Sequence, residues 1–322
     1  MPKHKLLQIG NITSRMANRL TGNFEIIEYF GSNDKNKLIA EHKKEIACIL
    51  TDGHWGVPDN LIERLPNLKI VSSYGVGYDA IDANFAASKN ITVTHTPNVL
   101  NDEVADTAIM LWLATYRNLI QADKWVREGN WEKKGAFPFS KTVQKQKVGI
   151  LGLGRIGETI AKRVKAFDAE VHYHSRSKKN NNYQFHASPK ELAKNADVLF
   201  VITPGGNETK HLVDTSVLKA LGTSGTLINI SRGSVVDERA LIEALQTGTI
   251  GAAGLDVFDA EPFVPIELKK MPNVILTPHI GSATNETRQA MGDLTCDNLV
   301  SFFKTGQVLT PVPECSKLNI QQ

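Results

Sequence analysis

Short runs of apolar and β-branched residues alternate with helix-like segments along the whole chain. The first five runs are KLLQI, FEIIEY, IACIL, LKIVSS and ITVTH, and six more follow: KVGIL, EVHYH, DVLFVI, TLINI, GLDVF and NVILT. Apolar runs separated by helical stretches are typical of buried parallel strands joined by crossover helices. The pattern therefore predicts an α/β fold made of two doubly wound parallel-sheet domains in tandem.

Helix signals place the boundaries between these domains. A long helix is expected from about residue 102 to 120, with Asn101 or Asp102 as its N-cap. The last helix is expected over Thr284–Lys304, because Gly306 is a typical C-terminal stop. In the SPKE segment, Ser188 is expected to cap a short helix. These signals divide the chain into domains 1–100 and 101–285, with a C-terminal segment 286–322.

Composition narrows the class of protein. The chain has 322 residues, of which 41% are hydrophobic and 22% charged, as expected for two globular domains. No apolar run approaches the roughly 18 residues of a membrane span, and the N-terminus shows no leader pattern. The net charge of +3 is too small and too dispersed to indicate nucleic acid binding. We expect neither a membrane nor a nucleic acid partner.

Cysteine usage indicates the compartment. The three cysteines, Cys48, Cys296 and Cys315, are odd in number and widely separated. This spacing argues against a disulfide framework and favours a reducing, cytoplasmic location. No C-x-x-C motif or Cys/His cluster is present, so no metal site is expected.

A glycine-rich motif follows the KVGIL run. Gly152, Gly154 and Gly157 have G-x-G-x-x-G spacing between a predicted strand and an amphipathic helix that begins near Arg155 and Ile156. In a dinucleotide-binding turn the first glycine allows the tight turn. The second admits a pyrophosphate and the third permits close helix packing. The helix N-terminus then offers N–H groups to the phosphates. The alternative is a glycine-rich turn without a ligand.

The strand after this motif ends in an unusual way. Selection of NAD usually needs an acidic residue about 20 residues beyond the motif, but here the chain reads His174, Ser175, Arg176. A carboxylate would repel a 2′-phosphate, whereas a hydroxyl and a guanidinium would donate hydrogen bonds to it. The sequence therefore predicts NADPH (NADP) in preference to NADH. The alternative is that these residues form a solvated basic turn.

Polar residues with catalytic potential follow three strands of the second domain. Arg232 stands after TLINI, Asp256 and Glu261 lie in GLDVFDAEP, and His279 follows NVILT. Ligands bind at the carboxyl ends of such strands. A histidine with a carboxylate partner can donate a proton, and an arginine can hold a substrate carboxylate. With a hydride carrier, these groups suffice to reduce a 2-oxo acid. Taken singly, each residue could instead be structural.

Six motifs in order carry a family resemblance over nearly the whole chain: SSYGVGYDAID, TPNVLNDEVADTA, VGILGLGRIG, LINISRGSVVDE, GLDVFDAEP and LTPHIGSAT. They resemble those of the D-isomer-specific 2-hydroxyacid dehydrogenases, most closely the glyoxylate/hydroxypyruvate reductase branch. The resemblance implies that Arg232 binds substrate, that Glu261 partners His279, and that His279 is the acid/base. It also implies that Asp256 bonds the nicotinamide carboxamide.

The same resemblance implies roles for the two domains. Domain 1–100, completed by 286–322, would be a flavodoxin-like substrate domain, and 101–285 a Rossmann cofactor domain. The backbone N–H groups of Val76 and Gly77 would receive the substrate carboxylate, as an anion-binding nest can. Thr107 would contact the cofactor, although it could equally be a buried helix threonine. The long helix, near residues 102 to 120, would support a homodimer interface. Met110 and Trp112 could belong to that interface or simply to the core.

The chain departs from the family pattern in two respects. The acidic residue that usually selects NAD is absent, and the sequence ends soon after VLTPVPE, which lowers the case for a serine-biosynthetic dehydrogenase.

Three hypotheses about function follow from these observations. The leading hypothesis is NADPH-dependent reduction of glyoxylate or hydroxypyruvate to glycolate or D-glycerate. A second is the reduction of another small 2-oxo acid, with aromatic residues of Asn130–Phe139 as candidates for the pocket. A third, of a different class, is a dinucleotide-sensing corepressor-like binding module.

Overall fold

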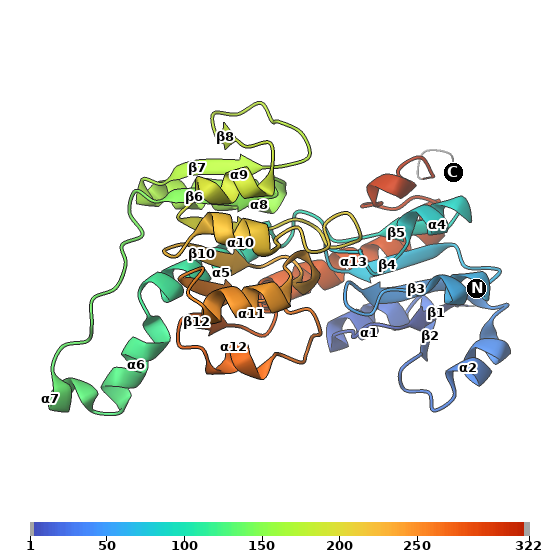
Figure 1. Ribbon diagram of the computed structural model, residues 1–322. Coiled ribbons are helices and arrows are strands. Elements are labelled where there is room, and N and C mark those ends of the chain that lie inside the picture. Colours follow the sequence, from blue (N-terminus) through green and yellow to red (C-terminus); the bar gives the residue numbers. More distant parts are fainter. Residues whose placement is uncertain (1–2, 319–322) are drawn as a thin grey trace. The chain divides into compact units, whose positions relative to one another are not determined.

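Residues 3–318 are described by a computed structural model, in which the chain forms two separate α/β units, each built on a parallel sheet. The first unit extends to Leu100 and resumes at Thr284, and the second is Asn101–Ala283 (Figure 1). The chain therefore leaves the first unit, forms the whole of the second, and returns to complete the first.

The first unit contains a five-stranded sheet in the order β2-β1-β3-β4-β5. All neighbouring strands are parallel. This is the flavodoxin-like order, which brings the carboxyl ends of all five strands to one edge. The strands are β1 (His4–Gln8), β2 (Phe24–Glu28), β3 (Ile46–Asp52), β4 (Ile70–Tyr74) and β5 (Thr92–Thr94).

Helices cover this sheet, and the C-terminal helix belongs to it. The helices are α1 (Ser14–Thr21), α2 (Lys35–His42), α3 (Asp59–Glu63), α4 (Ala83–Ser88), α13 (Asn285–Thr305) and the 3-10 turn η3 (Pro313–Cys315). Thr284 caps α13 and Gly306 ends it at a φ of 78°, which confirms the expected bounds of the last helix. The hydroxyl of Tyr74 donates to the carbonyl of Arg288, so α13 is fixed on β4. Residues 319–322 of the expected C-terminal segment lie outside the described residues.

The second unit contains a seven-stranded parallel sheet in the order β12-β11-β10-β9-β6-β7-β8, the doubly wound order of dinucleotide-binding domains. Its strands are β6 (Lys147–Leu151), β7 (Glu170–His174), β8 (Gln184–Phe185), β9 (Val198–Val201), β10 (Thr226–Asn229), β11 (Ala252–Leu255) and β12 (Val274–Leu276). The two-residue β8 was not expected. Strand β11 ends at Leu255, so Asp256 opens the loop that follows it.

The helices of the second unit differ in part from expectation. They are α5 (Asn101–Tyr116), α6 (Leu119–Arg127), α7 (Asn130–Lys134), α8 (Arg155–Val164), α9 (Pro189–Lys194), α10 (Thr215–Leu221), α11 (Glu238–Gln246) and α12 (Ile266–Lys270), with 3-10 turns η1 (Lys165–Phe167) and η2 (Gly233–Val235). The predicted helix 102–120 is interrupted, because Asn118 adopts a left-handed φ of 49°. The expected N-cap was also wrong, since Asn101 and Asp102 lie inside the first turn of α5. Ser188 caps α9 as predicted.

The cores account for several residues whose role the sequence left open. Trp112 is fully buried against Tyr116, Phe167 and Phe200, so it is a core residue. Met110, two positions away, is exposed. The three cysteines are buried and unpaired. Within residues 3–318, none of the helices is long and apolar enough to cross a bilayer, and no three His, Cys, Asp or Glu side chains gather to hold a metal.

Candidate active site

The glycine motif forms a tight turn between β6 and α8. Gly152 has a φ of 106°, a backbone conformation that favours glycine, and its N–H donates to the carbonyl of His174 at 2.9 Å. A Cβ at Gly157 would lie 2.2 Å from the carbonyl oxygen of Gly152. The first and third glycines are therefore required by the turn and by the close approach of α8 to it.

Gly154 differs from its two neighbours in the motif. A Cβ built on Gly154 would meet no atom within 4 Å, and the residue is exposed at the N-cap of α8. Protein packing therefore does not require glycine there, whereas close approach of a phosphate to the backbone would. Arg155 is exposed and Ile156 half-buried in the first turn, where unpaired N–H groups favour an anion. This loop fits the pyrophosphate of a dinucleotide.

The residues predicted to select NADPH, Ser175 and Arg176, lie in the loop between β7 and β8. The hydroxyl of Ser175 donates to the carbonyl of Ser177 at 2.7 Å, so its oxygen can still accept a hydrogen bond. Arg176 is exposed and, within the described part of the chain, makes no hydrogen bond or ion pair. The guanidinium is therefore available to an external anion.

His279 and Glu261 form a close pair. The His279 Nδ1 lies 2.7 Å from the Glu261 Oε2, and their side chains are 44% and 20% exposed. Burial raises the pKa of Glu261. The hydrogen bond and charge of His279, the N–H of Phe258 and the charge of Arg232 outweigh that effect and leave the pKa below its usual value. The carboxylate is thus ionised at neutral pH. It orients the ring so that Nε2 is left for another partner.

Asp256 holds the backbone of the loop that carries His279. Its carboxylate accepts hydrogen bonds from the Thr277 hydroxyl at 2.6 Å and from the N–H groups of Ile280 and Gly281, both at 2.8 Å. The residue is only 1% exposed. Burial raises the pKa of Asp256, and these hydrogen bonds oppose that rise. His279 itself has a left-handed φ of 53°, so this loop needs such support.

Arg232 stands between β10 and the 3-10 turn η2. Its backbone carbonyl accepts from the Asn229 side chain at 3.0 Å, and its guanidinium donates to the carbonyl of Ser231 at 2.9 Å. The next residue was missed by the sequence analysis. A Cβ at Gly233 would lie 1.9 Å from the carbonyl carbon of Phe258, so the Arg232 loop rests directly on the loop that carries Glu261. No local pattern marks this contact, because the two segments are far apart in sequence.

Thr107 is half-buried on α5, and its hydroxyl donates to the carbonyl of Gly281 at 3.4 Å. This bond ties α5 to the His279 loop. The contact of Thr107 with a cofactor remains a prediction. Arg232, Asp256, Glu261 and His279 all follow the carboxyl ends of β10, β11 and β12. These parallel neighbours bring the four residues to one edge of the second sheet.

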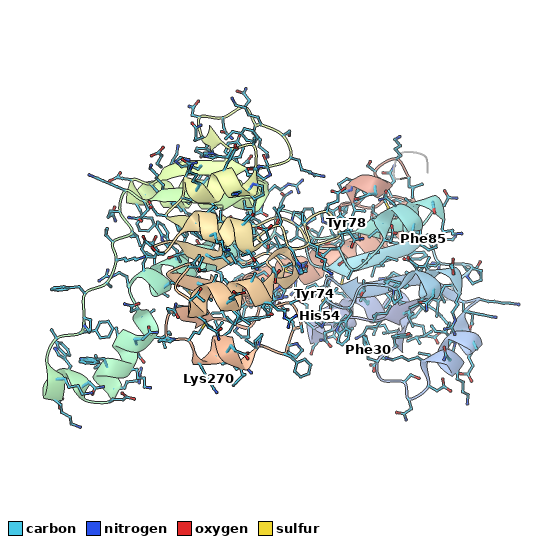
Figure 2. All side chains as sticks on the ribbon, in the orientation of Figure 1. Phe30, His54, Tyr74, Tyr78, Phe85 and Lys270 are labelled. Carbon is cyan, nitrogen blue, oxygen red and sulfur yellow. The ribbon has the colours of Figure 1, made fainter. Side chains whose placement is uncertain are left out.

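Val76 and Gly77 belong to the first unit. They follow β4, and the loop is fixed by the His95 Nδ1, 3.0 Å from the carbonyl of Val76, and by the Thr96 N–H, which donates to Gly75. Among the described residues, the N–H groups of Val76 and Gly77 have no protein acceptor. Figure 2 shows Tyr74, Tyr78 and His54 at the same edge of this sheet. The loop therefore offers two free donors to an anion.

Comparisons with known proteins show which family this chain resembles. Residues 109–281 match the family model for the NAD binding domain of D-isomer specific 2-hydroxyacid dehydrogenases. The glyoxylate/hydroxypyruvate reductase A HPR2 of Arabidopsis thaliana is 44% identical over 308 residues, 95% of this chain and 98% of that protein. Hydroxyphenylpyruvate reductase of Plectranthus scutellarioides is 43% identical over 308 residues, with the same coverage of 95% and 98%.

A solved structure is similar throughout. The NADPH-dependent glyoxylate/hydroxypyruvate reductase of Sinorhizobium meliloti, in complex with NADP and malonate, superposes with a TM-score of 0.91 at 44% identity. The match covers 97% of this chain and 98% of that chain.

Two glycine substitutions should separate packing from ligand binding. We expect Gly157→Ala to lower the free energy of unfolding by about 1–3 kcal/mol, because the new Cβ overlaps the Gly152 carbonyl. Gly154→Ala should change it by less than about 0.5 kcal/mol and weaken dinucleotide binding by about tenfold or more. Calorimetric unfolding and dinucleotide titration measure the two effects. Undiminished binding by Gly154→Ala would show that the loop does not contact the dinucleotide.

Proposed function

The chain belongs to the D-isomer specific 2-hydroxyacid dehydrogenases, and from that premise we propose that it is an NADPH-dependent reductase of glyoxylate and hydroxypyruvate. Membership of this family makes it an oxidoreductase with an NAD(P)-binding domain, and its relatives make it a 2-oxo acid reductase. The observation that carries the proposal is the His279–Glu261 pair, 2.7 Å apart, at the same carboxyl edge of the parallel sheet as the glycine loop. The products would be glycolate and D-glycerate.

His279 is assigned as the donor of the proton that the carbonyl oxygen receives during reduction. A nicotinamide dinucleotide held by the glycine loop would supply the hydride for the carbonyl carbon. His279 would give the proton on Nε2 to the carbonyl oxygen, while Nδ1 keeps its hydrogen bond to Glu261. Glu261 stabilises the imidazolium before transfer and holds the tautomer that remains afterwards. Glu261 thus orients the ring of His279, and His279 supplies the proton.

Two sets of donors are assigned to the substrate carboxylate. Arg232 offers a planar guanidinium, which suits a carboxylate through two parallel hydrogen bonds. Val76 and Gly77 offer the two free N–H groups that follow β4. Donors of either set would hold a 2-oxo acid by its charged end.

Asp256 and Thr107 are assigned to the nicotinamide end of the cofactor. A carboxylate has about four acceptor sites, and three of those on Asp256 are filled by the His279 loop. The remaining site could accept from a carboxamide. The Thr107 hydroxyl donates a hydrogen bond to the carbonyl of Gly281, and its oxygen can still accept one. Cofactor binding and the position of His279 would then be linked through the same loop.

The 2′-phosphate of NADPH is assigned to Ser175 and Arg176. Arg176 is exposed with no internal partner among residues 3–318, and no carboxylate occupies the selector position. The related Sinorhizobium meliloti enzyme is NADPH-dependent and was solved with NADP, which supports NADPH as the cofactor. NADH, which lacks the phosphate, would lose that interaction.

Another 2-oxo acid is the second candidate substrate class. The hydroxyphenylpyruvate reductase relative, 43% identical, favours it. A steady-state panel of glyoxylate, hydroxypyruvate and hydroxyphenylpyruvate with each cofactor decides between them by catalytic efficiency. The absence of turnover with all three, despite dinucleotide binding, would favour the corepressor-like binding module instead.

A homodimer in a reducing, cytoplasmic compartment completes the proposal. The arm, residues 119–139, contains α6 and α7, neither of which has a buried residue, and Figure 1 shows it extending from the second unit. Its exposed apolar side chains, 53–104% accessible, are Leu119, Ile120, Val126, Trp131 and Phe139. So much apolar surface on ordered helices favours a protein partner. A role for Asn130–Phe139 in a substrate pocket remains a prediction. The buried free cysteines fit a reducing compartment.

His279→Ala should lower kcat for oxo acid reduction by about 100-fold or more, because it removes the general acid. Arg232→Lys should instead act mainly on the KM of the oxo acid, because an ammonium cannot make a two-pronged contact with a carboxylate. Steady-state kinetics with saturating cofactor measures both. Near-normal turnover by folded His279→Ala would refute the assignment of the proton donor.

Glu261→Gln should slow the reduction of oxo acids. The pKa of Glu261 is lowered, so the wild-type residue is a carboxylate throughout the neutral range. Glutamine keeps an acceptor oxygen for the ring of His279 and removes the negative charge beside it. We expect kcat to fall by about tenfold or more, measured by steady-state kinetics with saturating cofactor. An unchanged kcat would mean that Glu261 does not assist the proton donor.

Arg176→Ala should reduce catalytic efficiency with NADPH by about tenfold, the lower end expected for a charged hydrogen bond at a solvent-exposed site. Efficiency with NADH should change little, because NADH has no 2′-phosphate. Ser175→Asp should go further, since it places a carboxylate beside the phosphate. Equal losses with both cofactors, or a wild-type preference for NADH, would contradict the assignment.

Ile120→Glu should convert a dimer into a monomer, since it places a charge on the apolar face of the arm. Sedimentation equilibrium at micromolar concentration gives the mass. Leu309→Glu is the matched control, because Leu309 is as exposed (57%) as Ile120 (58%) but lies outside the arm. A monomeric wild type, or dissociation by the control alone, would exclude the arm as the interface.

A further inference from the structure

The loop that carries the proposed phosphate ligands has few attachments of its own. It spans residues 175–183 between β7 and β8 and extends from the edge of the seven-stranded sheet (Figure 1). Arg176 and Lys178 are exposed, and the hydrogen bond from Ser175 to Ser177 is internal to the loop. A loop of this kind must be held from its ends if Arg176 is to have a defined place.

Tyr173 holds the far end of the segment that contains Arg176. Its ring is fully buried and packs edge-on against Phe185 of β8, with ring centroids 5.4 Å apart. Its hydroxyl accepts from the N–H of Lys179 at 2.8 Å and donates to the carbonyl of the same residue at 3.4 Å. One side-chain oxygen thus satisfies both backbone groups of a residue six positions further along the chain.

One end of this segment is tied to the glycine motif and the other to the helix that follows it. At the near end, the carbonyl of His174 accepts from the N–H of Gly152 at 2.9 Å. At the far end, the Nζ of Lys179 lies 3.3 Å from the Oε1 of Glu158, on the first turn of α8. Residues 175–178 therefore form a short closed loop, anchored at one end by Gly152 and at the other by Tyr173 and Glu158.

We propose that Tyr173 is a positioning residue for cofactor choice: its hydroxyl orders residues 175–178 so that Arg176 is presented to the 2′-phosphate. The proposal rests on the assignment of that phosphate to Arg176 under the proposed function. Without the hydroxyl, the loop must lose conformational freedom at the moment the phosphate binds, and that entropy opposes binding. A cofactor without the phosphate makes no use of the ordered loop.

Tyr173→Phe tests the hydroxyl and keeps the buried ring. Tyr183→Phe is the matched control, because its hydroxyl lies in the same loop and, among residues 3–318, makes no hydrogen bond. The ratio of catalytic efficiency with NADPH to that with NADH should fall about three- to tenfold for Tyr173→Phe and less than twofold for Tyr183→Phe. Calorimetric titration should show the same loss of affinity for 2′-phospho-AMP relative to AMP.

Amide hydrogen exchange tests the anchor without any cofactor. In the wild type, the amide of Lys179 should exchange more slowly than that of Lys178, and Tyr173→Phe should abolish the difference. Equal exchange at the two amides in the wild type would overturn the proposal, even if the variant failed to fold.

The kinetic outcomes distinguish this proposal from the one on which it rests. A wild type that does not prefer NADPH overturns the assignment of the phosphate to Arg176, and Tyr173 falls with it. A wild type that prefers NADPH, with an unchanged ratio in Tyr173→Phe, overturns the role of Tyr173 alone. An equal fall in the Tyr183→Phe control also overturns it, because the effect would then not depend on the anchored hydroxyl.

Discussion

The buried carboxylate of Asp256 supports the loop on which the candidate catalytic histidine stands. His279 has a left-handed backbone, a conformation that costs about 1–2 kcal/mol for a residue with a Cβ. Three hydrogen bonds from residues 277–281 to a charged acceptor, each contributing roughly 1.5–3 kcal/mol, can offset that cost. Because the charge is buried, the bonds are strong only while all three donors stay in place. The backbone position of His279 is thus fixed by Asp256, whose carbonyl also accepts from the His279 N–H at 2.9 Å, while Glu261 orients the ring.

Contact between backbones provides a second link across the same edge of the sheet. Gly233 lies so close to Phe258 that any side chain there would displace one of the two loops. Arg232 and Glu261 are therefore held at a fixed separation by main-chain packing rather than by flexible side chains. The N–H of Phe258 in turn donates to Glu261 at 3.0 Å. A site built in this way loses little conformational entropy when a ligand binds.

Most of the fold was predictable because parallel strands buried on both faces leave continuous apolar runs in the sequence. The strand β8 left no such run, since two residues pair with β7 through their backbones within a polar segment. The break at Asn118 was also missed, because the helical pattern continues across it and the left-handed conformation is confined to that residue, with a φ of 49° and a ψ of 43°.

The candidate site was predictable to the level of residue types at strand ends. Arg232, Glu261 and His279 stand at successive strand ends, so the order of the motifs placed them together before any distance was known. The contact between Gly233 and Phe258 and the anchor formed by Tyr173 were not predictable. A glycine in a turn and a tyrosine in a strand have ordinary local explanations, and their partners are fixed only by the tertiary fold.

Of the four outermost strands, β5, β8 and β12 are short or covered, whereas β2 has five residues. In the described chain, β8 has two residues and β12 three, while the three-residue β5 is covered by the segment around Val312, whose N–H donates to Val93. A long exposed edge would allow strands of neighbouring molecules to add to the sheet. The free edge at β5, β8 and β12 is therefore small, which limits this route to aggregation at these three strands, even though the sheets are built from highly apolar strands.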